Sequence, residues 1–280
     1  MISLLPRFAA EVHKHLLCNL LNTDLRPVTL GIFGRAGDGK SAQLAASLAA
    51  RGVDARRVVA SRLESSHAGE PGRLLATMYR DASAAIAGGT PAALIVDDVD
   101  TTVGEWENHT GTVNHLQVLA ELMHIADRPI DPDREWPNRV PIFVTGNNLG
   151  RLYPPLRRPG RMHLFAWRPT LGEVWVIAHH VLGDVAAPPA VDTLVREHGT
   201  EPLAFFADVR RAVVDAGLDR RLAAFPDDLA ILLKNRDTFA GLARFAPSEL
   251  LDGPSLLHVA QRVKDGRSDA GRDHLADYAD

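Results

Sequence analysis

The sequence predicts an α/β fold, in which a three-layer αβα domain with a parallel sheet is followed by a small all-helical domain. Up to about residue 170, short apolar runs alternate with stretches of helical periodicity, which is the pattern of a sheet covered by helices. A glycine-rich segment lies directly between one apolar run and one helical stretch. After Pro169 only helical patterns remain. We therefore place an α/β domain at 1–169 and a helical domain at 170–280.

The predicted strands are continuous apolar runs rather than alternating ones, which indicates strands that are covered on both faces. These runs cover residues 28–33, 58–61, 92–96, 140–144 and 164–167. Helical periodicity between them covers 41–50, 72–87 and 113–126. Because a strand–helix–strand order implies right-handed crossovers, the strands are expected to run parallel.

The region after Pro169 opens with a helix-start signal. Thr170 is followed three residues later by Glu173, which is a capping-box pattern, and the apolar positions Val174 and Ile177 then share one helix face. Further helical stretches, separated by prolines, continue to the end of the sequence. The second domain is therefore expected to contain helices only.

The glycine-rich segment 34–41 reads Gly-Arg-Ala-Gly-Asp-Gly-Lys-Ser, which is the phosphate-binding P-loop pattern in a strand-to-helix context. Its glycines let successive backbone N–H groups point at phosphate, and the following helix N-terminus adds partial positive charge. Lys40 is expected to reach the β- and γ-phosphates of ATP, and the Ser41 hydroxyl to bind Mg²⁺. The predicted nucleotide-binding residues of this loop are Gly34, Gly37, Asp38, Gly39, Lys40 and Ser41.

A P-loop needs a second strand that ends in acidic residues, because a carboxylate must help to hold the metal. The run 92–96 is followed directly by Asp97 and Asp98. We expect Asp97 to hold Mg²⁺ through a water molecule and Asp98 to polarise the attacking water. The two motifs together resemble the AAA+ pattern, and they predict an ATPase that uses ATP and Mg²⁺.

The AAA+ resemblance implies roles for polar residues further along the chain. Asn147 follows the run 140–144 and matches the first sensor, which orients the water against the γ-phosphate. Arg158 and Arg161 match arginine fingers that reach the nucleotide of a neighbouring subunit, where a guanidinium suits the developing charge. Arg210 matches the second sensor of a helical lid domain, and its neighbour Arg211 is the alternative.

Several stretches resemble Rubisco activases more closely than AAA+ proteins in general. They are Glu-Ser-Ser-His-Ala-Gly-Glu-Pro at 64–71, Arg-Val-Pro-Ile-Phe-Val-Thr-Gly-Asn at 139–147, Leu-Tyr-Pro-Pro-Leu at 152–156 and Gly-Arg-Met at 160–162. The resemblance runs from about residue 10 to about residue 215 and fades between 216 and 250. It implies a ring-forming ATPase, a hexamer, that remodels Rubisco and releases inhibitory sugar phosphates. The segments 64–71 and 101–110 would line the central pore.

The sequence also departs from the activase pattern. AAA+ proteins normally carry Glu where Asp98 stands, whereas activases share the Asp; its shorter side chain predicts slow turnover. Asp97 replaces the Asn usual in activases and returns to the general AAA+ pattern. The chain begins about thirty residues before its P-loop, so we expect the plant N-terminal extension to be absent. With Cys18 as the only cysteine, a redox pair is excluded.

Composition limits the partners and the location. The formal net charge of -4 and the pI of about 6.3 argue against nucleic-acid binding, which usually needs a basic stripe. No apolar run approaches the roughly 20 residues that cross a bilayer, so no membrane association is expected. The single cysteine fits a reducing compartment, and we expect the protein to be cytoplasmic.

Three other functions remain open from the sequence. The same motor could act on a different protein client, since the segment 216–250, where the resemblance fades, overlaps the region that gives activases their client specificity. A nucleotide-binding switch with low turnover is the second alternative, because Asp98 is shorter than Glu. A clamp-loader role on DNA is the third, and the acidic balance disfavours it.

Overall fold

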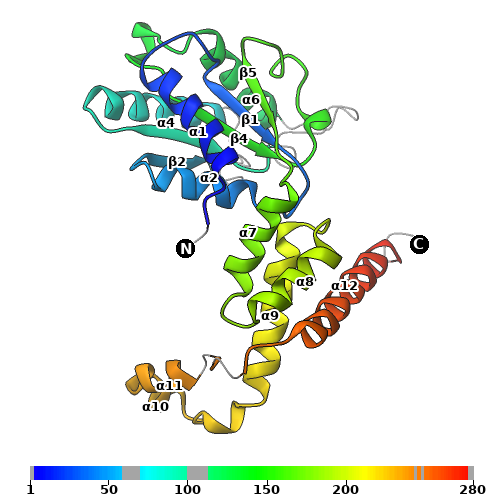
Figure 1. Cartoon of the computed structure of the whole chain (residues 1–280). Coiled ribbons are helices and arrows are strands. Elements are labelled where there is room, and N and C mark those ends of the chain that lie inside the picture. The colour runs from blue at the N-terminus through cyan, green and yellow to red at the C-terminus, as the bar shows by residue number, and fades with distance from the viewer. Residues whose placement is uncertain (1–2, 59–69, 100–112, 243–244, 247–248, 277–280) are drawn as a thin grey trace. The chain divides into compact units, whose positions relative to one another are not determined.

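The computed structural model describes residues 3–58, 70–99, 113–242, 245–246 and 249–276 (Figure 1). The chain divides into two compact units, Ile2–Arg168 and Pro169–Asp280. In the described part of the first unit, five parallel strands form one sheet in the order β2-β3-β4-β1-β5. The strands are β1 (Thr29–Phe33), β2 (Asp54–Val58), β3 (Ala92–Val96), β4 (Ile142–Gly146) and β5 (Met162–Ala166).

Helices cover both faces of this sheet, which confirms the predicted three-layer arrangement (Figure 1). The helices are α1 (Pro6–Leu20), α2 (Lys40–Ala49), α4 (Glu70–Ala87) and α6 (Val113–Asp127), with short 3-10 turns at Pro132–Arg134 and Leu149–Arg151. Helices α4 and α6 pack against each other over Leu94 and Val144 of the sheet. Phe8 of α1 contacts Phe165 of β5 on the opposite face, with ring centroids 5.7 Å apart. Successive residues of a strand face opposite layers, so the fully buried strands β1, β3 and β4 need continuous apolar runs.

Strand β2 is the element that the sequence misplaced. The apolar run 58–61 overlaps β2 only at Val58, and its other residues lie outside the described part of the chain. The prediction was wrong because, among the described strands, β2 pairs with β3 alone and forms an edge of the sheet, where most of its side chains are exposed. An edge strand does not need an apolar sequence, so Arg56 and Arg57 can occupy it.

Strands β4 and β5 begin and end close to the predicted runs, and their registers explain the differences. Ile142 of β4 and Met162 of β5 both pair with Thr29, the first residue of β1. Strand β4 therefore continues beyond Val144 to Gly146, and β5 begins two residues before the predicted run. Pairing with the central strand β1 sets these ends, and hydropathy alone does not reveal it.

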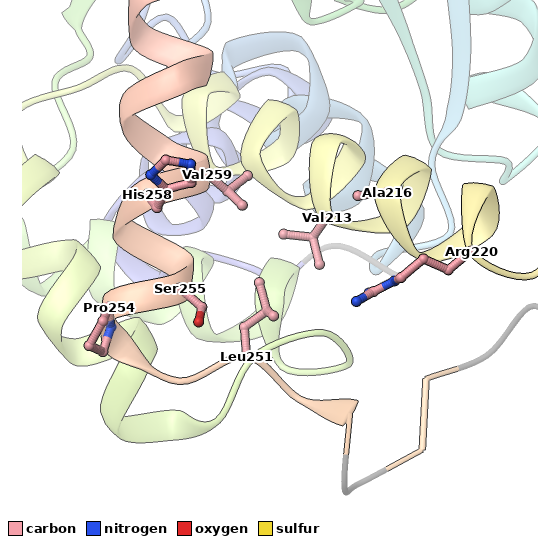
Figure 2. A pocket seen from close by; sticks show the side chains of 8 residues that line it. All are labelled: Val213, Ala216, Arg220, Leu251, Pro254, Ser255, His258 and Val259. Carbon is pink, nitrogen blue, oxygen red and sulfur yellow. The ribbon is translucent and has the colours of Figure 1, made fainter.

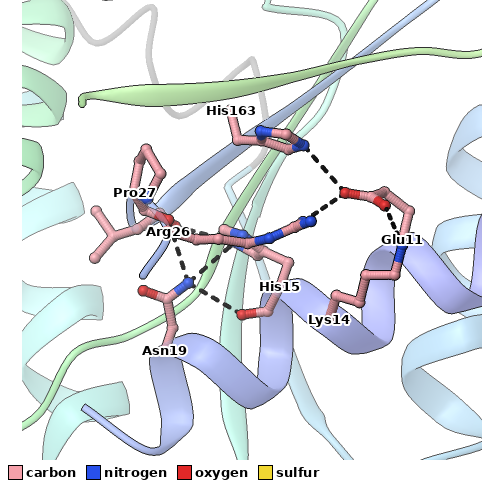
Figure 3. Close-up of polar contacts among 8 residues, drawn as sticks. Glu11, Lys14, His15, Asn19, Arg26, Pro27 and His163 are labelled. Atoms are coloured by element: carbon pink, nitrogen blue, oxygen red, sulfur yellow. Dashed lines mark hydrogen bonds and ion pairs between the residues drawn. The ribbon is translucent and has the colours of Figure 1, made fainter. Parts of the chain in front are cut away.

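A buried polar network holds α1 against the sheet (Figure 3). His15 is fully buried, and its Nε2 lies 3.0 Å from the carbonyl oxygen of Val28. The Asn19 amide donates to the carbonyl oxygens of His15 and Pro27, at 3.0 and 3.2 Å. Near the other end of the network, Glu11 pairs with Arg26. Buried polar groups stabilise a fold only when they are hydrogen-bonded, and these groups are.

Acid is expected to destabilise the first unit through His15. Burial lowers the pKa of His15 from 6.5 to about 3, so the native protein stays neutral there while the unfolded chain takes up a proton below pH 6.5. Keeping His15 neutral therefore costs nothing above pH 6.5, and the free energy of unfolding decreases as the pH falls from 6.5 towards 3. At pH 5 the decrease is about 2 kcal/mol. Urea unfolding at pH 7 and pH 5 measures this loss.

The variant His15→Gln should show a smaller loss between the two pH values than the wild-type protein. His13 lies on the exposed side of the same helix, so His13→Gln is the matched control and should keep the full loss. A loss that is equal in His15→Gln and the wild type would remove His15 as the acid-sensitive group.

The second unit is helical in its described residues. Its elements are α7 (Leu171–Leu182), α8 (Pro188–His198), α9 (Leu203–Asp219), a 3-10 turn (Leu222–Ala224), α10 (Leu229–Lys234), α11 (Arg236–Leu242) and α12 (Gly253–Ala276). The predicted capping box is present at the start of α7, because Thr170 Oγ1 accepts from the Glu173 amide at 3.3 Å and Glu173 Oε2 accepts from the Thr170 amide at 2.7 Å.

A cavity of about 540 Å³ lies where α9 approaches α12 in this helical unit (Figure 2). Val213 of α9 and Val259 of α12 supply apolar side chains, and Arg220 and His258 supply polar ones.

Among the described helices of the chain, none combines the length and the apolar composition that crossing a bilayer requires.

Candidate functional site

The sheet order brings the predicted motifs to one edge. In a parallel sheet all strands end at the same edge, and ligands bind in the crevice outside those carboxyl ends. Strand β4 lies between β1 and β3, so the segments that follow these three strands are neighbours. Those segments carry the P-loop after Phe33, the acidic pair after Val96 and the amide of Asn147 after Gly146.

The P-loop backbone requires glycine at several positions. Gly37 and Gly39 have φ angles of 80° and 76°, in the left-handed region that other residues rarely adopt. A Cβ atom at Gly34 would lie 2.0 Å from the carbonyl oxygen of Trp167, so only glycine fits there. Helix α2 then begins at Lys40, and the partial positive charge at the start of a helix favours an anion there.

Lys40 joins the P-loop to the predicted sensor. Its side chain is 6% exposed, and its ammonium group donates to the carbonyl oxygens of Gly34 and Arg35 at 2.8 and 3.0 Å. A third bond of 2.7 Å runs to Oδ1 of Asn147 at the end of β4. The structure thus places two predicted site residues that are 107 positions apart in direct contact.

Asp97 is the centre of a second set of contacts. Its Oδ1 accepts from the hydroxyls of Ser41, at 3.1 Å, and Thr145, at 2.9 Å. Its Oδ2 accepts from the guanidinium of Arg57 on β2. Carboxylate and hydroxyl oxygens are the hard ligands that Mg²⁺ prefers, so Ser41 and Asp97 fit a magnesium site. The predicted nucleotide and metal residues therefore lie side by side.

Asp98 has an unusual backbone. Its φ angle is 49°, in the left-handed region, which Asp tolerates better than most residues with a Cβ. Its amide donates to Oγ1 of Thr145 at 3.1 Å, and its side chain is exposed. Thr145 thus fixes both acidic residues, one through Asp97 Oδ1 and the other through the Asp98 amide. An exposed carboxylate next to the predicted metal ligand has the position that the predicted role of Asp98, to polarise water, requires.

Trp167 is a residue whose role at this site sequence reasoning missed. Its indole Nε1 donates to the carbonyl oxygen of Asp38 at 2.8 Å, and its backbone amide donates to Phe33 at 2.6 Å. The guanidinium of Arg7 lies 4.5 Å from the centre of the Trp167 ring. The buried Trp167 therefore holds the P-loop from the end of β5, and a tryptophan directly after an edge strand was the available signal.

The arginines predicted to act as fingers do not lie at the P-loop of their own chain. Arg158 and Arg161 precede β5, whereas the P-loop follows β1, to which β5 runs parallel. The two sites are separated by the length of a five-residue strand, roughly 16 Å. Arg161 instead makes two bonds to Asp127, at 2.7 and 2.6 Å, and these bonds raise its pKa.

Arg210, the predicted second sensor, lies in α9 of the helical unit. Its guanidinium makes two bonds to Asp184, at 3.0 and 2.5 Å, and these bonds raise its pKa. Its neighbour Arg211 pairs with Asp208 at 2.9 Å. The two arginines thus have different partners within the helical unit, and the role of Arg210 stays a prediction.

The segments 64–71 and 101–110, predicted to line a pore, lie outside the described residues except for Glu70 and Pro71.

A comparison with protein families decides the family. The model of the AAA family, described as the ATPase family associated with various cellular activities, matches residues 30–170. That range is about half of the chain, and it contains the P-loop, Asp97, Asp98 and Asn147. The chain belongs to the AAA family of ATPases. Arg158 and Arg161 lie within this AAA match, whereas Arg210 lies beyond it.

Relatives of this AAA protein are Rubisco activases. It is 36% identical over 221 residues to the ribulose bisphosphate carboxylase/oxygenase activase of Anabaena sp., covering 75% of this chain and 53% of that protein. It is 35% identical over 220 residues to the chloroplastic activase of Arabidopsis thaliana, covering 75% of this chain and 46% of that protein. The AAA chain thus spans about half the length of these relatives, and the resemblance seen in the sequence is confirmed.

A solved structure supports the AAA fold. A chain from the structure of the E. coli MS115-1 HORMA:CdnC:Trip13 complex matches with a TM-score of 0.57 and covers 81% of this chain and 84% of its own length. The two sequences are 19% identical, so this likeness concerns the fold.

Proposed function

We propose that this AAA protein is an ATP-dependent remodeller that hydrolyses ATP to change the conformation of Rubisco and release inhibitory sugar phosphates. The observation that carries the ATPase part is the contact of Lys40 with Asn147, together with that of Ser41 with Asp97. The predicted phosphate-binding residue Lys40 thus lies beside the predicted sensor Asn147, and the predicted metal ligands Ser41 and Asp97 lie beside each other. Transfer of a phosphoryl group to water needs these groups around one nucleotide.

The protein groups divide the work of hydrolysis in this proposal. The P-loop amides and Lys40 bind the phosphates. Ser41 and Asp97 would hold Mg²⁺, which would supply positive charge to the phosphates when bound. Asp98 accepts a proton from the attacking water, and Asn147 orients that water. Lys40 already donates to Asn147, so a phosphate bound to Lys40 would lie next to the sensor amide.

The client and the assembly are proposed from the relatives. Proteins named ribulose bisphosphate carboxylase/oxygenase activase supply the proposed client, Rubisco. The position of Arg161 at the edge opposite the P-loop supports a closed homo-oligomer, which we propose to be a hexameric ring, because a neighbouring subunit must then supply the finger. A cytoplasmic location is part of the proposal, and the single cysteine supports it.

The test is the reactivation of Rubisco that carries a bound sugar-phosphate inhibitor, with Rubisco taken from the same organism as this chain. ATP should restore carboxylation in the presence of the wild-type protein, and omission of ATP should abolish the effect. ATP turnover is measured in parallel. Turnover without reactivation would reject Rubisco as the client and keep the motor, whereas absence of both would reject the motor.

A nucleotide-binding switch with low turnover is the second candidate, and the observation that favours it is Asp98. Its carboxylate is one methylene shorter than the Glu of other AAA+ proteins, and its backbone has a left-handed conformation. Both features affect how closely the base approaches the water. The variant Asp98→Glu separates the candidates: a base that is merely distant should give faster turnover with the longer side chain, whereas a switch should gain little.

A further inference from the structure

Arg57 contacts the carboxylate that is predicted to hold the metal, although no motif points to it. The strand register explains the contact. Arg57 of β2 pairs with Ile95 of β3, and Asp97 lies two residues further along the same chain direction. Since side chains two residues apart lie on the same face, Arg57 extends along the face that carries Asp97. Its guanidinium donates to Asp97 Oδ2.

The neighbouring arginine of the same strand behaves differently. Arg56 lies on the other face of β2, because successive side chains of a strand alternate. Its Nε donates to Asp54 Oδ2 at 2.9 Å. The two arginines therefore differ in their partner, and only Arg57 contacts the predicted metal ligand.

Within the described part of the chain, the hydrogen bonds that Asp97 accepts come from donors of the protein. Ser41 and Thr145 donate to Oδ1, and the positively charged Arg57 donates to Oδ2. A magnesium ion that shares this carboxylate must do so beside a second positive charge. Like charges repel, so the guanidinium and the ion compete for the same oxygen atoms. The Arg57 side chain is 43% exposed, which leaves it a path into solvent when the ion binds.

We propose that Arg57 is a positioning residue that competes with Mg²⁺ for Asp97 and so sets the Mg²⁺ concentration at which the P-loop accepts nucleotide. The proposal rests on the proposed nucleotide site. In this mechanism the guanidinium keeps the Asp97 carboxylate paired and oriented until the metal arrives with the nucleotide. Binding of the metal then releases Arg57 from the end of β3.

The test measures nucleotide binding rather than turnover. The affinity for a fluorescent ADP analogue is recorded over a Mg²⁺ titration that starts in excess EDTA. Arg57→Met removes the charge and keeps a long side chain, and it should lower the Mg²⁺ concentration at half-maximal effect by about two- to fivefold, the range that loss of one partly exposed ion pair allows. Arg57→Lys keeps the positive charge and should stay near the wild-type value.

The control is Arg56→Met, which removes the same charge from the adjacent position and should leave the Mg²⁺ midpoint unchanged. A midpoint for Arg57→Met that equals or exceeds that of the wild type would overturn the inference. Loss of affinity in EDTA would also overturn it, because Arg57 would then bind phosphate directly. Arg57→Gln repeats the measurement if the methionine variant unfolds at a lower temperature. Failure of the wild type to bind nucleotide at any Mg²⁺ concentration would instead reject the proposed function.

Discussion

Lys40→Ala is expected to lower the affinity for ATP by at least about 100-fold, because charge-assisted hydrogen bonds contribute about 1.5–3 kcal/mol each. The ammonium group of Lys40 is held within 3.0 Å of three acceptors from the P-loop and β4, so it is already positioned for phosphate. The same change removes the contact to Asn147, and turnover should fall below detection. Equilibrium binding of ATP and phosphate release measure the two effects.

A loss of fold would imitate this result, so thermal unfolding accompanies the measurement. ATP should raise the Tm of the wild type and leave that of Lys40→Ala unchanged, because a ligand stabilises only the state that binds it. The exposed Lys14, which pairs with Glu11 on α1, provides the matched control. Lys14→Ala should keep wild-type affinity. A normal affinity in Lys40→Ala would remove the phosphate-loop assignment.

Arg161→Ala is expected to leave nucleotide binding intact and to slow turnover of the assembled protein by about 1000-fold, the scale of a missing arginine finger. Arg161 lies just before the first residue of β5, whereas the P-loop follows the last residue of the parallel strand β1. Arg161 therefore cannot reach a nucleotide bound to the P-loop of the same subunit. A neighbouring subunit is therefore the expected recipient of its charge. Turnover is measured at protein concentrations above and below assembly, and only the assembled wild type should be fast.

Loss of the ion pair between Arg161 and Asp127 is a second possible cause of slow turnover in Arg161→Ala, and the experiment must distinguish it from loss of the finger. If Arg161 serves only this pair, Arg161→Ala and Asp127→Asn should reduce turnover equally, since each breaks the same bonds. If Arg161 acts on a neighbour, Asp127→Asn should keep turnover, because the guanidinium remains. The pair is partly exposed, and its loss should cost at most about 1 kcal/mol of stability.

Mixed assemblies test the direction of the contact. A Lys40→Ala subunit retains Arg161, and an Arg161→Ala subunit retains its P-loop. Where the first supplies its arginine to the second, a complete site forms, so mixtures should hydrolyse ATP faster than either variant alone. Mixtures that are no faster than their components would argue against a finger that acts in trans.

The sequence by itself determined the local parts of the site. The P-loop is contiguous, and its glycines have the positive φ angles or the close backbone approach that their pattern predicts. The αβα fold and the capping box at Thr170 were likewise predictable, because continuous apolar runs and cap spacing depend on near neighbours. The family resemblance was readable for the same reason, since it lies in short contiguous segments.

Only the tertiary structure decided which distant residues meet. The contact of Lys40 with Asn147, and the place of Thr145 between the two acidic residues, follow from the insertion of β4 between β1 and β3. The contact of Arg57 with Asp97 depends on a register between an exposed edge strand and β3, which no hydropathy pattern records. Strand order and register arise from the packing of the whole sheet. The sequence therefore predicted which residues carry the chemistry, and the order and register of the strands determined which of those residues lie next to one another.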